Sequence, residues 1–464
     1  MAERFKLIVL DDDPTGSQTV HSCPLLLRWD GASLRRGLAH ASPLLFVLAN
    51  TRALDADAAR ERVRDICRSL KPQLAWAEAA GHLDRWMVVS RGDSTLRGHF
   101  PLEVEVLHEE LGPFDVTLLA PAFLPGGRTT VAGVHLLDGQ PVHTTPFARD
   151  RLFGFSTSDL PTWVEHKSGG RISASAVQRF SLAELDAAAT TSGGMDRLCD
   201  RLRACSGNML VAVDAEQPHQ LMALGTAVRR VSAQGLRVMA HSAASLINGL
   251  VDLQPQPFEP RCLLGMRRLD DRGELLPGLV LVGSHVPLAD AQLGRLLRDQ
   301  ACAGLELPVA EVAQHLQDEM QPQSTFNLHS SLLRQLRAQL QAGRTPVLYT
   351  TRGELPCSSP DERRRLGLEL AGLMARLVAA LKPELGYVIS KGGITTHTLL
   401  ADGLGLAQVD LQGQLMPGLS LVLAADLPVI TFPGNLGDPD TLLQIWQAVE
   451  MIQSSGEGHL SCPK

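Results

Sequence analysis

The sequence predicts an α/β protein with two domains, each a mostly parallel sheet flanked by helices, and with a ligand cleft between them. Short apolar runs alternate along the chain with longer segments in which apolar residues recur about every 3.6 positions. This alternation is typical of βαβ units and therefore of parallel sheets. The length of 464 residues exceeds that of one ordinary domain, which is about 100–200 residues.

The N-terminal half contains apolar runs of strand length. The predicted strands are Leu7–Leu10, Leu44–Leu48, Trp86–Val89, Val116–Ala120, Met209–Val213 and Val238–Ala240. Helical spacing appears between them, as in Ala56–Leu70 and Pro101–Leu111. The stretch Gly126–Gly170 is rich in Gly, Thr, Ser and His, and a loop this long is usually functional unless it hides short strands.

The C-terminal half repeats this organisation. Its predicted strands are Leu279–Val282, Val347–Thr350, Tyr387–Ser390, Ser420–Ala424 and Val429–Phe432, with helices at Ala289–Ala301 and Pro360–Leu381. Three prolines lie in the connecting segment Leu253–Gly273 and favour an extended connector there. We therefore expect domains at residues 1–252 and 274–464, with a hinge between them.

Composition and charge exclude several classes of protein. The net charge of −7 argues against a broad electrostatic grip on nucleic acid or an anionic membrane. The eight Cys residues form no C-x-x-C pair and no zinc spacing, which favours free thiols in a reducing compartment. The apolar run at Lys6–Leu10 is too short for a signal sequence and leads directly into three aspartates. We therefore expect a cytoplasmic protein without nucleic-acid or membrane partners, and the sequence leaves open whether it forms a homo-oligomer.

The sharpest local signal is the acidic segment Asp11–Ser17, which directly follows the first predicted strand. Ligands of open α/β sheets gather at the carboxyl ends of the strands. Three adjacent carboxylates there repel one another, so a polyol, Mg²⁺ or a hydroxyl that needs a base would offset their cost. The alternative is a solvated turn, opened by Asp13 and Pro14 and closed by Gly16.

Two further segments after predicted strands carry arginines. The segment Ser90–His99 contains Arg91 and Arg97, whose guanidinium groups suit a carboxylate, together with Asp93 and Ser94, which can bond hydroxyls. The alternative for this segment is helix capping with surface ion pairing. The next loop presents Arg128 beside two glycines and two threonines, another arrangement suited to anions.

The C-terminal half contains glycine turns in place of carboxylate clusters. They are Val282–His285, Lys391–Thr396 and Phe432–Gly437, and each follows a predicted strand. Backbone N–H groups in such turns can approach phosphates, although ordinary βα turns look similar. The Walker A spacing and the G-x-G-x-x-G fingerprint are both missing from the sequence, as are zinc-protease and G-x-S-x-G motifs.

Together these motifs resemble the four-carbon acid sugar kinase family, whose members phosphorylate threonate, erythronate and 3-oxo-tetronate. The resemblance covers nearly the whole chain, in a longer subgroup with Asp-Pro-Thr-Gly and Gly-Gly-Ile-Thr motifs. The matching segments are Asp11–Gly16, Asp93–Gly98, Pro121–Phe123, Gly127–Arg128, Val282–Ser284, Gly392–Thr395 and Pro433–Gly437. The chain differs from the family pattern at Ile394, where an Asp is usual, and at His241, where an Arg is usual.

The resemblance implies an N-terminal domain that binds the sugar acid and a C-terminal domain that binds ATP with Mg²⁺. The residues carried over for the substrate are Asp11, Asp12, Arg91, Asp93, Ser94 and Arg97, with Arg128 added from its loop. Those carried over for the nucleotide are Ser284, Gly392, Gly393, Ile394, Thr395 and Gly434. The implied reaction is transfer of the γ-phosphoryl group to a hydroxyl of a small sugar acid, with Asp11 or Asp12 as the base.

Two other functions remain open from the sequence. One is a different enzyme acting on hydroxy acids, although neither a Schiff-base lysine nor a metal cluster is evident for an aldolase. The other is a non-catalytic sensor of sugar acids, which the departure at Ile394 favours. Release of ADP that depends on the substrate would distinguish a kinase from both.

Overall fold

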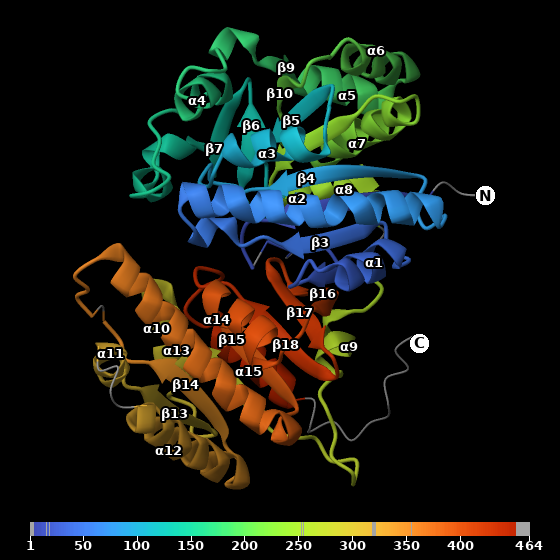
Figure 1. Ribbon diagram of the computed structural model, residues 1–464. Helices are drawn as coiled ribbons and strands as arrows, with labels where there is room; N and C mark the ends of the chain where they lie inside the picture. The colour runs from blue at the N-terminus through green and yellow to red at the C-terminus, as the bar shows by residue number, and fades with distance from the viewer. Residues whose placement is uncertain are drawn as a thin grey trace. The chain divides into compact units, whose positions relative to one another are not determined.

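The computed structural model describes residues 4–14, 16–17, 19–251, 253, 255–317, 322–353 and 355–451. The chain divides into two compact units, Met1–Pro255 and Gln256–Lys464, called here the N-terminal and C-terminal units. Figure 1 colours the first from blue to green and the second from yellow to red. Within the described residues, no helix is long and apolar enough to cross a membrane.

A parallel sheet forms the centre of the N-terminal unit. Its strands, in spatial order, are β2 (Cys23–Leu26), β3 (Leu44–Leu48), β1 (Phe5–Asp11), β4 (Arg85–Arg91), β11 (Val238–Ser242), β5 (Val116–Ala120), β10 (Met209–Val213) and β9 (Gln178–Phe180). Every neighbouring pair in this order is parallel. The predicted strands of this half are confirmed. The sequence analysis missed β2 and β9, which are too short to show a period.

Helices cover this sheet. They are α1 (Gly31–Ala39), α2 (Ala56–Ala79), α3 (Leu102–Leu111), α4 (Leu160–Lys167), α5 (Leu182–Thr190), α6 (Ser192–Arg203), α7 (Pro218–Ser232) and α8 (Ala244–Val251). Helices α1 to α4 share one core with the sheet face that carries Ile8 and Leu10, and α2 runs along the sheet in Figure 1. Helix α2 continues past the predicted end at Leu70 because Leu74 and Ala77 keep its buried stripe.

The long irregular stretch at residues 126–170 does hide strands. A small antiparallel sheet forms from β6 (Arg128–Val131), β7 (Val134–Leu137) and β8 (Gln140–Pro141). His135 of β7 is fully buried, and its two ring nitrogens lie 2.9 Å from Thr130 Oγ1 and 2.9 Å from the carbonyl oxygen of Ser94. The small sheet is thereby attached to the loop that follows β4.

The C-terminal unit also has a mostly parallel sheet. Its spatial order is β13 (Cys302–Leu307), β14 (Thr345–Thr350), β12 (Gly278–Val282), β15 (Tyr387–Lys391), β18 (Leu427–Phe432), β17 (Leu419–Ala424) and β16 (Gln408–Met416). In this spatial order, neighbouring strands are parallel from β13 as far as β18. Strand β17 pairs antiparallel with both β18 and β16. The predicted fold class of a mostly parallel sheet with flanking helices is confirmed in each unit.

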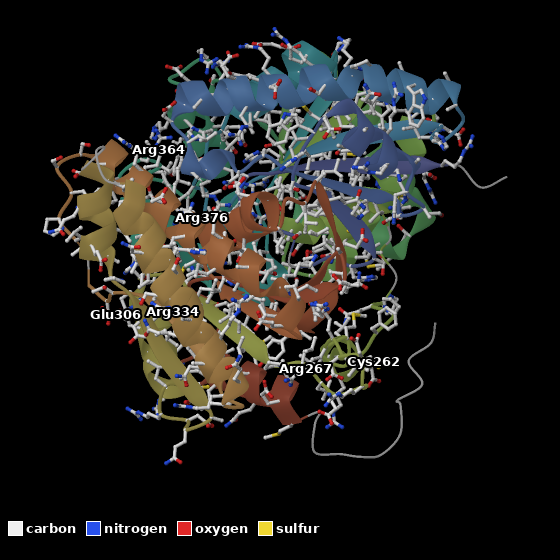
Figure 2. The ribbon with its side chains drawn as sticks, turned by 60° about the horizontal axis from the view of Figure 1, so that its bottom comes forward. Cys262, Arg267, Glu306, Arg334, Arg364 and Arg376 are labelled. Carbon is white, nitrogen blue, oxygen red and sulfur yellow. The ribbon has the colours of Figure 1, made fainter. Side chains whose placement is uncertain are left out.

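The helices of the C-terminal unit are α9 (Pro260–Leu264), α10 (Pro287–Leu296), α11 (Val309–Gln317), α12 (Pro322–Gln341), α13 (Pro360–Leu381), α14 (Gly393–Thr398) and α15 (Thr441–Met451). Helix α13 has the predicted bounds, and Arg364 and Arg376 lie along it (Figure 2). Helix α10 ends before the predicted Ala301, because the chain turns there into β13. The predicted connector contains α9, which begins at Pro260 in the first helical position, where proline is favoured.

Arg267, just after α9, is part of a buried polar group in the C-terminal unit (Figure 2). Its side chain is 2% exposed, and Nη1 lies 2.9 Å from Glu450 Oε2. Its Nε donates to the carbonyl of Leu276 at 2.7 Å, and Tyr387 donates its hydroxyl to Glu450 at 2.6 Å. This group therefore links the segment after α9 to α15 and β15.

Replacing Arg267 by Met should lower the free energy of unfolding of the C-terminal unit by about 3–5 kcal/mol, the usual cost of breaking a buried ion pair. Glu450 and the Leu276 carbonyl would both lose their charged partner. Urea unfolding would measure the shift. The exposed Arg272→Met is the matched control and should change the stability by less than about 0.5 kcal/mol; equal shifts in the two variants would contradict a role for the Arg267 pair.

Candidate functional site

Polar residues of the N-terminal unit gather at one edge of its sheet. Asp11, the last residue of β1, lies opposite Leu48 of β3 and Arg91 of β4. Ser242, at the end of β11, also lies opposite Arg91. Since these strands are parallel, the segments that follow them emerge at the same edge, where α/β sheets bind ligands. The structure thus brings together residues that are far apart in the sequence.

Asp12 is the centre of this group. Its carboxylate is nearly buried and accepts two hydrogen bonds from Arg52, at 2.6 Å from Nη2 and 3.0 Å from Nε. Arg91 Nη1 lies 3.3 Å from the same carboxylate and 3.7 Å from Asp11 Oδ1. A bidentate pair of this kind fixes orientation as well as charge. Asp12 is therefore held between two arginines from different loops.

Asp93 extends the group along the loop after β4. It accepts hydrogen bonds from Thr95 Oγ1 and, at 2.8 Å, from Arg97 Nε, and it lies 3.7 Å from Arg52 Nη1. Burial alone would raise the pKa of Asp93, but the charges of Arg52 and Arg97 outweigh burial and hold it well below its usual range. Asp93 therefore stays ionised. We call Asp11, Asp12, Arg52, Arg91, Asp93 and Arg97 the aspartate–arginine cluster.

Asp11 has a different environment from its neighbours. Its side chain is 1% exposed, and Oδ2 is buried with no hydrogen-bond partner among the residues that the structure describes. Burial raises the pKa of Asp11 to about 8, and the nearby charge of Arg91 offsets this only in part. Gly16 packs directly against it, since a Cβ at that position would lie 1.8 Å from Asp11 Oδ1. Asp11 is thus mostly protonated at neutral pH, in contrast to Asp93. Thr15, which belongs to the same sequence motif, lies outside the described residues.

Arg128 and Ser94 lie near this cluster. Ser94 is half-buried, and its carbonyl faces His135. Burial lowers the pKa of Arg128, and the charge of Asp93 opposes this effect. Within the part of the chain that the structure describes, the Nε atoms of Arg91 and Arg128 are buried without an acceptor. These N–H groups could donate to an anion.

The sequence analysis did not identify Arg52, although it has the largest number of acidic neighbours in the cluster. Besides Asp12, its Nη1 lies 3.5 Å from Asp13 and 3.7 Å from Asp93. Burial by itself lowers the pKa of Arg52, but these carboxylates hold it well above its ordinary value. The signal was available, because Arg52 is in the polar segment that follows the buried strand β3.

In the C-terminal unit, the glycine turns after β12, β15 and β18 pack against one another. A Cβ at Gly283 would lie 2.0 Å from Thr395 Oγ1, and one at Gly434 would lie 2.5 Å from Ser284 Oγ. Gly392 has φ +123° and lies beside Ser284 and Thr395. We call these residues, with Gly393, the glycine turns. The structure therefore brings together five residues whose proximity could not be seen from their order in the sequence: Ser284, Gly392, Gly393, Thr395 and Gly434.

Two side chains at these turns have opposite environments. Lys391 is fully buried; its Nζ donates to the carbonyl of Pro433 at 2.9 Å and lies 4.0 Å from the centre of the Phe432 ring. Burial lowers the pKa of Lys391 to about 7. Ile394, by contrast, is 48% exposed in the first turn of α14. It offers no charge to a ligand at this position.

Metal binding by the protein alone finds no support in the geometry. In residues 4–451 with the gaps stated above, no group of three or more His, Cys, Asp or Glu side chains is placed to hold a metal ion. The glycine turns present hydroxyl and backbone groups, a donor set that fits phosphate oxygens. The seven cysteines described are all free thiols.

Two family models cover the two units. A sugar-binding N-terminal domain matches residues 7–250, and a nucleotide-binding C-terminal domain matches residues 279–442. The first match contains the aspartate–arginine cluster, and the second contains the glycine turns. Their order along the chain is the order that the resemblance predicted.

Curated relatives match over most of their length. A D-threonate kinase of Salmonella typhimurium is 26% identical, over 96% of this chain and 99% of the relative. A D-threonate kinase of Cupriavidus necator is 27% identical, over 82% and 86%. A D-erythronate kinase of Heliobacterium modesticaldum is 22% identical, over 86% and 85%.

Two solved structures share the fold. A Salmonella typhimurium LT2 protein described as a tRNA synthase has a TM-score of 0.66 and 17% identity, with 95% of this chain and 98% of that chain covered. A Haemophilus influenzae protein has a TM-score of 0.61 and 17% identity, with 96% and 100% covered. At this identity the likeness concerns the fold alone.

Proposed function

Because the chain belongs to the four-carbon acid sugar kinase family, we propose that it transfers the γ-phosphoryl group of ATP to a hydroxyl of a small sugar acid, of four carbons. The observation that carries this proposal is the aspartate–arginine cluster, in which Asp12 is held between Arg52 and Arg91 at the carboxyl ends of β1, β3 and β4. Such a site combines groups for a carboxylate with groups for hydroxyls.

In this proposal, one set of side chains binds the carboxylate of the sugar acid and another set binds its hydroxyls. The buried N–H groups of Arg91 and Arg128 that have no acceptor, together with Arg97, suit the carboxylate of the acid. Asp93 and Ser94 suit its hydroxyls, since an ionised Asp93 accepts hydrogen bonds.

Asp12 is the better of the two candidate bases. Asp11 is mostly protonated at neutral pH and has to lose its own proton before it can accept another. The carboxylate of Asp12 is fixed in orientation by Arg52, which leaves it placed to accept the proton of the attacking hydroxyl. Asp11 then serves as the uncharged neighbour that keeps three adjacent carboxylates from repelling one another.

The nucleotide binds in this proposal at the glycine turns. Ser284, Thr395 and the backbone of Gly392, Gly393 and Gly434 face its phosphates, and Ile394 offers only its backbone and an apolar surface. Mg²⁺ would neutralise phosphate charge in this reaction. Phosphoryl transfer asks the protein mainly for positioning and charge neutralisation, which the two groups of residues supply.

The proposal is tested by ADP release from ATP and Mg²⁺ with a panel of four-carbon sugar acids. The expected result is turnover that depends on one acid of the panel. Binding of an acid without ADP release would instead identify a sensor, and release of ADP without any acid would identify a nucleotide hydrolase.

Replacing Gly434 by Ala should raise KM for ATP by about tenfold while leaving KM for the acid unchanged. The new Cβ would meet Ser284 Oγ at 2.5 Å and displace this hydroxyl from its position between the turns, and small displacements of binding groups are costly. Steady-state kinetics would measure both constants. Gly294→Ala, on α10, is the matched control because its Cβ would meet nothing within 4 Å; an unchanged KM for ATP in Gly434→Ala would remove the glycine turns from the nucleotide site.

A further inference from the structure

Glu103 is a buried carboxyl in the first turn of α3, behind the aspartate–arginine cluster. Its Oε1 accepts a hydrogen bond from Thr51 Oγ1 at 2.5 Å, and its Oε2 accepts one from Ser90 Oγ at 3.0 Å. Both hydroxyls are buried as well. No motif of the sequence pointed to Glu103, and the proposed reaction has not used it so far.

The two residues that Glu103 holds have a common property: each directly precedes an arginine of the cluster. Thr51 precedes Arg52, and Ser90 precedes Arg91. One carboxyl therefore links the turn after β3 to the end of β4. His99 reinforces the same turn, because its Nε2 lies 3.1 Å from the carbonyl oxygen of Thr51 and 3.0 Å from that of Leu54.

The hydrogen bonds continue from Ser90 to His241 of β11, whose Nδ1 lies 3.0 Å from Ser90 Oγ. The Ser90 hydroxyl has one proton to donate. When Glu103 is ionised, Ser90 donates to it and a neutral His241 donates from Nδ1 to Ser90. When Glu103 carries a proton, it donates to Ser90, and Ser90 donates to Nδ1 of the neutral His241 tautomer that has its proton on Nε2. This series of hydrogen bonds thus fits both protonation states of Glu103 while every heavy atom keeps its place.

We propose that Glu103 is a positioning residue for the sugar-acid site: it sets the spacing of Arg52 and Arg91 across Asp12, and it takes up a proton when an anionic substrate binds there. The proposal rests on the function proposed above for the aspartate–arginine cluster. Glu103 acts through Thr51 and Ser90 and does not touch the substrate.

The charges around Glu103 support the proposed uptake of a proton by Glu103. Burial and the charge of Asp12 raise the pKa of Glu103, whereas the hydrogen bonds from Thr51 and Ser90 and the charge of Arg52 lower it, and the pKa that results is about 7. A substrate carboxylate beside Asp12 adds negative charge and acts in the same direction. The ionisable and charged groups near Glu103 include Asp11, Asp12, Arg52, Arg62, Arg91, His99 and His241. Burial lowers the pKa of His241 to about 4, so His241 stays neutral and does not take up this proton.

Calorimetric binding of D-threonate and D-erythronate at pH 7, in two buffers of different ionisation enthalpy, tests the proposal. The wild-type protein should take up a fraction of a proton per acid bound, and its affinity should fall as the pH rises from 6 to 8. Glu103→Gln, whose neutral amide resembles the protonated carboxyl, should show less uptake and a flatter pH profile, with the remainder assigned to Asp11, and an affinity close to that of the wild type at pH 6. Glu103→Ala, which leaves the Thr51 and Ser90 hydroxyls without their acceptor, should bind the acid about tenfold more weakly.

Glu105→Gln is the matched control, because Glu105 lies on the same helix and pairs with the exposed Arg171. It should behave as the wild type does. Equal proton uptake and pH profile in the wild type and Glu103→Gln, or wild-type affinity in Glu103→Ala, would overturn the inference while leaving the kinase proposal intact. Acid binding with uptake but no ADP release would overturn the kinase proposal and leave Glu103 in its role.

A second measurement needs no ligand. Folding raises the pKa of Glu103 from 4.5 to about 7, so the stability that this group contributes is present at low pH and is lost as the pH rises through 7. Glu103→Gln lacks this loss. Its Tm relative to the wild type should therefore increase between pH 5 and pH 8, and a constant difference would overturn the inference even if neither acid binds.

Discussion

Replacing Asp12 by Asn should lower kcat/KM for the sugar acid by about 10³-fold, within the range expected for loss of a positioned general base. The substitution keeps the shape of the side chain but removes the oxygen charge that accepts the proton and that pairs with Arg52 and Arg91. Most of the loss should appear in kcat, because binding of the acid depends on other groups of the cluster. Steady-state ADP release would measure it.

Asp57→Asn provides the matched control for this prediction. Asp57 lies exposed in the first turn of α2, and its replacement should leave the kinetics unchanged. If Asp12→Asn keeps more than a tenth of the activity while Asp11→Asn loses it, the base is Asp11 and the assignment made above is wrong.

Replacing Arg52 by Met should lower kcat/KM by about 10²-fold, because loss of its hydrogen bonds frees Asp12 from its fixed orientation. The free energy of unfolding should fall as well, by about 3–5 kcal/mol, since the carboxylates of Asp12, Asp13 and Asp93 would lose a shared counter-charge. Kinetics and urea unfolding of the same variant would measure the two effects.

Arg68→Met is the control for Arg52→Met, because Arg68 lies on α2 with its side chain 66% exposed. Arg52→Lys separates charge from geometry: Lys keeps the charge but cannot form the bidentate pair, so most of the kinetic loss should remain. Full activity in Arg52→Lys would contradict the argument that the orientation of Asp12 is what Arg52 provides.

The sequence predicted much of the cluster for one physical reason. Polar residues that directly follow a buried strand lie at the carboxyl edge of the sheet, and this rule located Asp11, Asp12 and Arg91. The same rule applies to Arg52, but a single arginine within an otherwise ordinary turn is a weak signal in the sequence. Glu103 was beyond reach, because it lies on a helix and its role depends on which hydroxyls the fold brings to it.

The fold was predictable where strands are buried on both faces. Strands such as β3 and β5 are continuous apolar runs, and their predicted bounds agree with the structure. Strand β13 alternates buried and exposed residues along much of its length, and β16 alternates buried with less buried ones, most of them Gln. Half-buried strands of this kind give a weaker signal than continuous runs, which is why both were missed.

Identification of the product by mass spectrometry tests the proposed reaction, in which the protein makes a phosphate ester of a sugar acid. The wild-type protein, incubated with ATP, Mg²⁺ and D-threonate or D-erythronate, should yield a phosphorylated acid in an amount equal to the ADP formed. Recovery of both acids unchanged, with ADP absent or accompanied only by inorganic phosphate, would contradict the account.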